Sequence, residues 1–106
     1  MLNTKVLAEI MSFMIIGHVI HNVSLPPTQK LVLIVLADFY NDESGKAWPS
    51  QNTLCTVTGL SPRSINRAIS ELKRKGYIRV WKERSAGQYS HNVYRINHTP
   101  QRHIVE

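Results

Sequence analysis

The sequence has very little cysteine and no long apolar run. Its 106 residues include a single cysteine, Cys55, which excludes an internal disulfide framework and suits a reducing compartment. No apolar run approaches the roughly 20 residues that a membrane-spanning helix needs. The apolar stretch 13–20 is too interrupted for a secretory signal, because Gly17 and His18 break it and no cleavage site follows. We therefore expect a cytoplasmic protein without a membrane segment.

The signatures of enzymes and metal sites are also missing. The chain has no G-x-S-x-G elbow, no Walker-type loop and no glycine-rich dinucleotide loop. Two histidine pairs are present, His18 with His21 and His98 with His103. No cysteine or acidic cluster completes a zinc site with either pair. We expect no catalytic activity, no cofactor and no metal, and we interpret Cys55 as a small buried residue rather than a redox sensor.

Acidic residues are scarce in the C-terminal part of the chain. Residues 1–60 contain three basic and four acidic residues, whereas residues 61–106 contain ten basic and three acidic residues. The net charge of +6 therefore has its whole excess in the C-terminal part. Such a concentration indicates a polyanionic partner, because contacts with phosphates release counterions.

The N-terminal part predicts two helices of different clarity. Apolar residues recur at helical spacing up to about residue 14, but the β-branched residues that follow also suit an extended segment. We expect a helix there with an irregular tail. Residues 28–41 predict a clearer helix, with Thr28 as its N-cap and an apolar run over 31–37. A helix this apolar needs cover on nearly all sides, so residues 4–23 are expected to cover one face.

A short helix is predicted after the turn 41–45. Ser50 is a candidate N-cap, and the helix runs to about residue 58. Gly59 can end it in the left-handed conformation. Leu54 and Val57 are expected to point inward.

A longer helix follows at once. Ser61 is its candidate N-cap, Pro62 occupies the first helical position, and Gly76 stops the helix after about residue 75. Its buried stripe should comprise Ile65, Ala68, Ile69 and Leu72, which recur at helical spacing.

These two helices have the pattern of a helix-turn-helix. That motif needs a small residue where the helices cross, a glycine in the turn and an apolar residue early in the second helix. Cys55, Gly59 and Ile65 meet these three demands.

A β-hairpin is predicted next. The pattern alternates over 77–81 and 92–96, with a tip at 85–87, and residues 46–48 suit a further short strand. The inward residues should be Ile78, Val80, Tyr94 and Ile96. Trp48 and Trp81 are interpreted as core and hairpin packing rather than as surfaces for base stacking.

Four segments of the chain carry a resemblance to a known family: residues 25–33 (LPPTQKLVL), 36–38 (LAD), 48–54 (WPSQNTL) and 58–65 (TGLSPRSI). Over about residues 25–81 the chain resembles a winged helix-turn-helix family that occurs in phage and plasmid replication initiators and in prophage regulators. The resemblance implies a winged-helix fold that binds DNA through the second helix of the motif. Initiators of this kind usually carry further domains, and residues 1–24 lie outside the match.

We therefore predict a mainly α-helical fold with a small β-hairpin wing, a winged helix-turn-helix with a three-helix core. Residues 1–24 form an N-terminal apolar segment for packing and dimerisation. Residues 25–97 form the DNA-binding domain, and residues 98–106 form a loose tail. We expect double-stranded DNA as the partner of a protein that regulates transcription or replication of a mobile element, with a replication or transcription protein as a possible second partner.

The predicted contacts with DNA fall into two groups. The helix 61–75 should enter the major groove, where arginine suits guanine and asparagine suits adenine. Its expected base contacts are Arg63, Ser64, Asn66, Arg67 and Ser70. The wing 82–91 should meet the backbone, as should the free N–H groups at the start of the Ser50 helix. The expected backbone contacts are Ser50, Gln51, Asn52, Ser61, Lys73, Arg74, Lys82, Arg84 and Gln88.

Alternatives to this function remain open. A winged helix can also serve as a protein-interaction module whose basic face binds an acidic protein, or as an architectural DNA binder with little sequence choice. The apolar surplus of residues 6–20 predicts a homodimer built through that segment, with the two recognition helices facing successive turns of DNA. The competing interpretation is that this segment only completes the core of a monomer.

Overall fold

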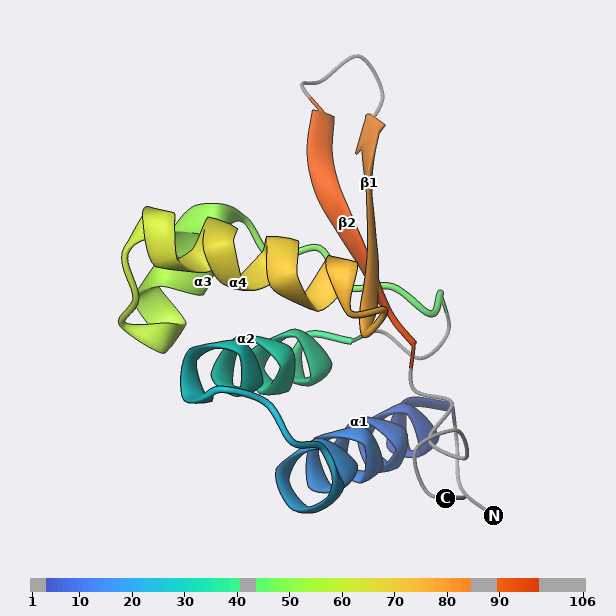
Figure 1. Ribbon diagram of the computed structural model, residues 1–106. Helices are drawn as coiled ribbons and strands as arrows, with labels where there is room; N and C mark the ends of the chain where they lie inside the picture. Colours follow the sequence, from blue (N-terminus) through green and yellow to red (C-terminus); the bar gives the residue numbers. More distant parts are fainter. Residues whose placement is uncertain (1–3, 41–43, 85–89, 98–106) are drawn as a thin grey trace.

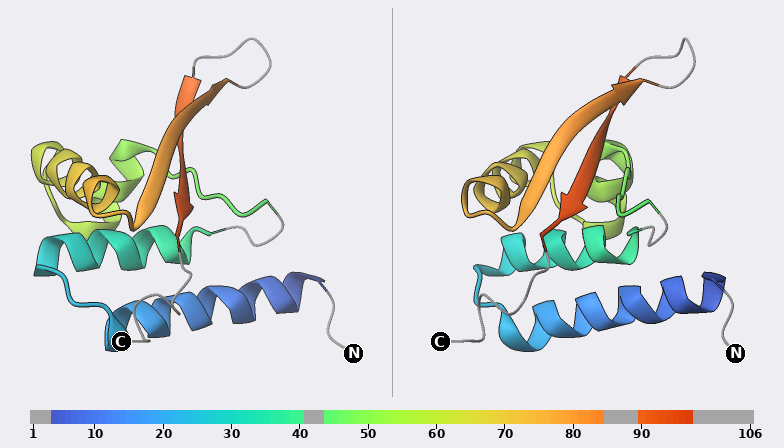
Figure 2. Two further views of the ribbon diagram at one scale, coloured as in Figure 1. Left: turned by 45° about the vertical axis from the view of Figure 1, so that its right-hand side comes forward. Right: turned by 90° about the vertical axis from the view of Figure 1, so that its right-hand side faces the viewer.

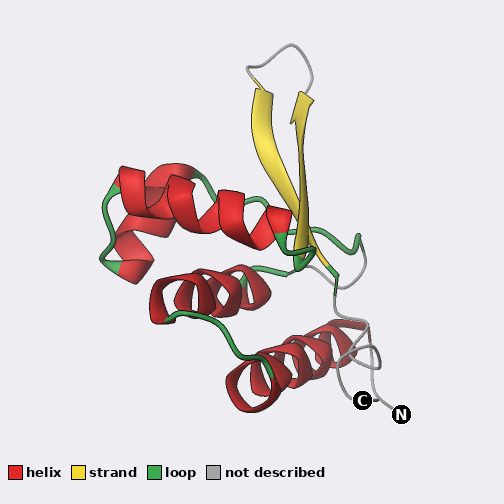
Figure 3. Cartoon of the chain, viewed as in Figure 1, coloured by secondary structure: helices red, strands yellow, loops and turns green. Residues whose placement is uncertain are grey.

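The computed structural model describes residues 4–40, 44–84 and 90–97. These residues form helices followed by an antiparallel hairpin (Figures 1 and 3): α1 (Thr4–Asn22), α2 (Pro27–Asp38), α3 (Gln51–Thr58), α4 (Pro62–Arg74), β1 (Ile78–Arg84) and β2 (Ser90–Ile96). Helix α2 lies between α1 on one side and the α3–α4 pair on the other, and the hairpin projects away from the helices (Figures 1 and 2).

Helix α1 is continuous, which corrects the predicted irregular tail. Ile15 and Val19 lie four residues apart in α1, Val23 follows at the same spacing just after the helix, and all three are buried in the core cluster that α1 shares with α2. β-Branched residues have only modest helix propensity by themselves. Burial of this stripe supplies the stability that local propensity lacks, since most helical stability in proteins comes from packing of one face.

Polar contacts also fasten α1 to α2. The Ser12 hydroxyl donates to the carbonyl of Ala37 over 2.9 Å, and Lys30 Nζ donates to the carbonyl of Ile20 over 2.8 Å. The lysine thereby satisfies one of the carbonyls that the last turn of a helix leaves open. This arrangement confirms that the N-terminal segment covers one face of α2.

The N-cap of helix α2 lies two residues earlier than predicted. Its N-cap is Pro26, and Pro27 occupies the first helical position, so Thr28 lies inside the helix and is not the cap. Proline suits this position because the first N–H groups of a helix have no partner within it. The helix ends at Asp38 rather than near residue 41. Its buried residues are Val32, Leu33, Val35, Leu36 and Ala37.

In the segment before α3, Ala47 forms an isolated β-bridge with Tyr94, where a strand over 46–48 was predicted. Ala47 exchanges both backbone hydrogen bonds with Tyr94, each of 2.8 Å, and is fully buried. Successive side chains of an extended segment point to opposite sides. Trp48 is therefore directed outward and is 49% exposed, so its predicted place in the core is wrong.

The hairpin is longer than the alternating pattern indicated. Strand β1 extends to Arg84 and β2 begins at Ser90, with Ile78 paired to Ile96 at the base. The inward assignment is confirmed for three residues, Ile78, Tyr94 and Ile96, while Val80 is half-buried. The predicted tip 85–87 and the tail 98–106 lie outside the described residues.

The core joins the helices to the base of the hairpin. Leu54 of α3, Leu72 of α4 and Tyr94 of β2 are almost completely buried in one cluster with α1 and α2. Each large apolar side chain buried in this way contributes about 1.5–3 kcal/mol. A three-helix core, a covering N-terminal helix and a two-stranded hairpin confirm the predicted winged helix-turn-helix fold.

Candidate nucleic-acid interface

Helix α3 is delimited by the two residues that the sequence indicated. The Ser50 hydroxyl accepts from the N–H of Thr53 over 3.0 Å, and Gly59 ends the helix at a φ of 78°. Leu54 is buried as expected, but Val57 is 53% exposed, which corrects its inward assignment. The inward face continues instead at Thr58, whose hydroxyl donates to the Leu54 carbonyl over 2.6 Å.

Helix α4 begins at a second serine cap and is anchored by a strict apolar stripe. The Ser61 hydroxyl accepts from the N–H of Ser64 over 3.1 Å, and Pro62 follows at the first helical position. The stripe residues Ile65, Ala68 and Leu72 are buried, and Ile69 is half-buried against the same core. Because this stripe is fixed, the opposite side of α4 faces solvent.

The solvent side of α4 carries most of the predicted base contacts. We call four exposed residues the readout face: Arg63, Asn66, Arg67 and Ser70. Among the described residues, neither arginine of this face forms an ion pair. Ser64 is different, because it is half-buried and its hydroxyl accepts from Ser61 Oγ over 3.1 Å. The structure thus brings four of the five predicted base contacts together on one open surface.

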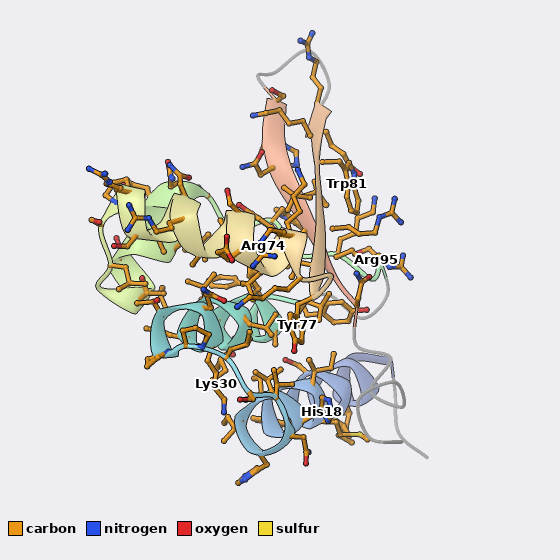
Figure 4. The ribbon with its side chains drawn as sticks, in the orientation of Figure 1. His18, Lys30, Arg74, Tyr77, Trp81 and Arg95 are labelled. Carbon is orange, nitrogen blue, oxygen red and sulfur yellow. The ribbon has the colours of Figure 1, made fainter. Side chains whose placement is uncertain are left out.

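Lys73 and Arg74, predicted to meet phosphate, lie at the C-terminal end of α4. Both are exposed, but Arg74 already pairs with Glu71, with a distance of 2.7 Å between Nη2 and Oε1. Hydrogen bonding from this guanidinium holds the pKa of the Glu71 carboxyl below its ordinary value. Arg74 is labelled in Figure 4, near the base of the hairpin.

The start of α3 meets the readout face directly. Gln51 and Asn52 are both exposed at the first turn, where they were predicted to contact the DNA backbone. Gln51 Nε2 donates to Asn66 Oδ1 over 2.6 Å. Sequence spacing alone gave no sign of this contact, because it depends on how α3 crosses α4.

The wing places its two predicted cations on one face of the hairpin. Ile78, Val80, Lys82 and Arg84 alternate along β1, so they share the face that packs on the core at its base. Farther out, Lys82 and Arg84 are exposed. Because β1 contacts α4 at this base, the two cations extend the basic surface beyond α4. Gln88 lies outside the described residues.

The other face of the hairpin carries charges that the sequence-based site omitted. We call this group the outer cluster: Arg79, Trp81, Glu83 and Arg95 belong to the hairpin, and Lys46 reaches it from the segment before α3. Arg79 and Arg95 are directly paired across the strands, and Trp81 and Arg95 extend away from α4 (Figure 4). The alternation of the two strands, read with the correct register, would have revealed this pair.

Glu83, the acidic residue of the outer cluster, accepts hydrogen bonds from two other members of it. Glu83 Oε2 accepts from Trp81 Nε1 over 2.8 Å and from Lys46 Nζ over 2.9 Å. These hydrogen bonds lower the pKa of the Glu83 carboxyl. The cations of Lys46 and Arg79 lie 6.0 and 5.9 Å from the centre of the Trp81 ring, within cation–π range.

The part of the chain that the structure describes has neither a metal cluster nor a membrane-spanning helix. It contains no group of three His, Cys, Asp or Glu residues that could hold a metal ion. The Nδ1 atom of His18 lies 3.4 Å from the amide nitrogen of Asn22, while His98 and His103 fall outside the described residues. None of its helices has the length and apolar character to cross a bilayer.

A basic helix face beside a projecting hairpin defines a winged helix-turn-helix, a class in which the second motif helix commonly binds DNA. Residues 23–78, more than half of the chain, match the family described as a helix-turn-helix domain. The chain belongs to this helix-turn-helix family. The match runs from the end of α1 to the start of β1, and so includes both motif helices. No curated protein and no solved structure matches the chain.

Proposed function

We propose that this protein binds double-stranded DNA in a sequence-specific manner and regulates transcription or replication of a mobile element. Helix α4 would enter the major groove and the wing would lie along the backbone. The observation that carries this proposal is the readout face, in which Arg63 and Arg67 are exposed and form no ion pair within the described residues. Unpaired guanidinium groups can form bidentate bonds with guanine.

The surroundings of the readout face support the same orientation. Lys82 and Arg84 extend the positive surface along the wing, and Ser50 caps a helix whose first N–H groups can meet a phosphate. The predicted contacts that the structure describes thus lie on α4, the start of α3 and the α4-facing side of β1. The resemblance of residues 25–81 to initiators and prophage regulators supports the assignment to a mobile element.

Loss of one base contact tests this orientation. We expect Arg67→Ala to relax the preference at one base pair, at a cost of about 1–3 kcal/mol for the lost bidentate contact. The measurement is selection from a random-sequence duplex library, followed by titration of the selected duplex.

The matched control is Arg95→Ala, which removes the same charge from the outer cluster. It should leave the selected sequence unchanged, because Arg95 lies on the hairpin face that points away from α4. If Arg67→Ala retains the full preference, α4 does not read the bases. If the wild type prefers an acidic protein segment to every duplex, the interaction-module alternative holds instead.

We also propose that the protein forms a homodimer through α1. Ile10, Phe13, Met14 and Ile20 are exposed and recur at helical spacing on one side of α1. Phe13 and Met14 are 73% and 63% exposed, an apolar surface typical of a partner contact. Helix α2 separates α1 from α4 (Figure 1), so dimerisation here leaves the readout face accessible. Two recognition helices on successive turns would supply more specificity than one.

A further inference from the structure

The contact between Gln51 and Asn66 joins the two motif helices on their exposed side. Gln51 is the first residue of α3, and Asn66 lies in the second turn of α4. The 2.6 Å hydrogen bond links side chains that are 15 residues apart in sequence. Both side chains are exposed, so the bond lies at the surface that the proposed function assigns to DNA.

This bond distinguishes the two ends of the Asn66 amide. An asparagine side chain accepts at Oδ1 and donates at Nδ2, and its terminal torsion allows either end to face outward. Gln51 occupies the Oδ1 end. No side chain among the described residues accepts a hydrogen bond from Asn66 Nδ2. The amide is therefore oriented with its donating end left for a ligand.

We propose that Gln51 is a positioning residue that determines which end of the Asn66 amide meets the DNA base. The inference rests on the proposed function, because it requires α4 to lie in the major groove. A donor directed there matches the acceptors N7 of a purine, O6 of guanine and O4 of thymine. Cytosine presents an amino donor on the same edge and is disfavoured at this contact.

Replacing the hydrogen-bond donor at residue 51 with an acceptor tests the proposal. The carboxylate introduced by Gln51→Glu can only accept, so Asn66 keeps the contact by turning Nδ2 toward it. Oδ1 then faces the groove and matches the amino groups of cytosine and adenine. We expect selection from a random-sequence duplex library to show this change at one base pair, with relative affinities shifted by about tenfold.

Two control variants separate positioning from charge and from folding. Asn52→Asp introduces the same charge at the next exposed residue, and Asn52 forms no bond with Asn66 among the described contacts. It should weaken all duplexes alike and preserve the selected sequence. Gln51→Met removes the donor at similar length and should flatten the preference at the same base pair only. Thermal unfolding of all three variants should match the wild type, since the changed side chains are exposed.

The experiment distinguishes failure of the positioning role from failure of the proposed function. The proposal is overturned if Gln51→Glu and Asn52→Asp weaken binding equally and select the same sequence as the wild type. That result would leave the proposed function intact. If the wild-type protein selects no sequence at all, the proposed function fails and the positioning role fails with it.

Discussion

Small side chains allow α4 to pack closely against α2 and α3. Ala68 is only 3% exposed, between the fully buried Ile65 and Leu72 on the inner stripe of α4. Cys55 of α3, which was expected to be buried, is half-buried and packs against the same core. Protein cores are close-packed, so added volume at such a position displaces a helix. The orientation of the readout face therefore depends on buried side chains on the opposite face of α4.

The first prediction concerns the volume at Ala68. We expect Ala68→Leu to lower the free energy of unfolding by about 1–3 kcal/mol, because the larger side chain overpacks the core that α4 shares with α2 and α3. Chemical denaturation provides the measurement. Ser70→Leu is the matched control on the exposed side of the same helix, and its effect should stay within about 0.5 kcal/mol. Equal effects of the two variants would contradict the packing described for α4.

At the same scale, sequence patterns predicted both serine caps correctly, but they misplaced the cap of α2 and two side chains assigned to the core. Ser50 and Ser61 could be identified because capping depends on residues three apart in the chain. Val57 and Trp48 were assigned inward wrongly, because their exposure depends on which neighbours arrive from distant segments. The partner of Asn66 was unpredictable for the same reason.

Among the elements, the hairpin shows how strand alternation divides charge between two faces. Lys82 and Arg84 share the face that reaches α4 at its base, whereas Arg79 and Arg95 lie opposite each other on the outer face. Two like charges in direct register repel each other. Arg79 also lies over the Trp81 ring, within cation–π range. The two faces of one hairpin are therefore expected to contribute differently to DNA binding.

The second prediction follows from this division. Lys82→Ala and Arg84→Ala should each weaken binding to all duplexes about equally and reduce the salt dependence by roughly one unit, as expected for lost phosphate contacts. Titrations at several salt concentrations measure the slope. Arg79→Ala removes a similar charge from the outer face and should leave the slope unchanged. If Arg79→Ala reduces the slope and Lys82→Ala leaves it unchanged, DNA lies on the outer face.

At the scale of the whole molecule, α1 has two apolar faces, of which one is buried in the core and the other is exposed. Ile15 and Val19 are buried in the core, whereas Phe13 and Met14 face solvent. Gly17 lies on the same outward side, and a Cβ there would meet no atom within 4 Å. A second helix could approach closely at this point, because glycine adds no side chain.

The third prediction tests the proposed dimer. The full chain should sediment as a dimer at micromolar concentrations, and the double variant Phe13→Ser with Met14→Ser should sediment as a monomer, since it removes the most exposed apolar side chains. Val57→Ser is the control, because Val57 is a comparably exposed apolar residue on α3. A wild-type monomer, on and off DNA, would contradict the dimer, as would a dimer that survives the double substitution.

By itself, the sequence determined the features that depend on near neighbours in the chain. The serine caps, Gly59, the inner stripe of α4 and the alternation of the strands follow from spacings of two to four residues. The tertiary structure decided the continuous helix α1 and the outward direction of Trp48. It also decided the pairing of Gln51 with Asn66. Each of these depends on contacts between distant segments, whose free energy outweighs local propensity and leaves no mark in a local pattern.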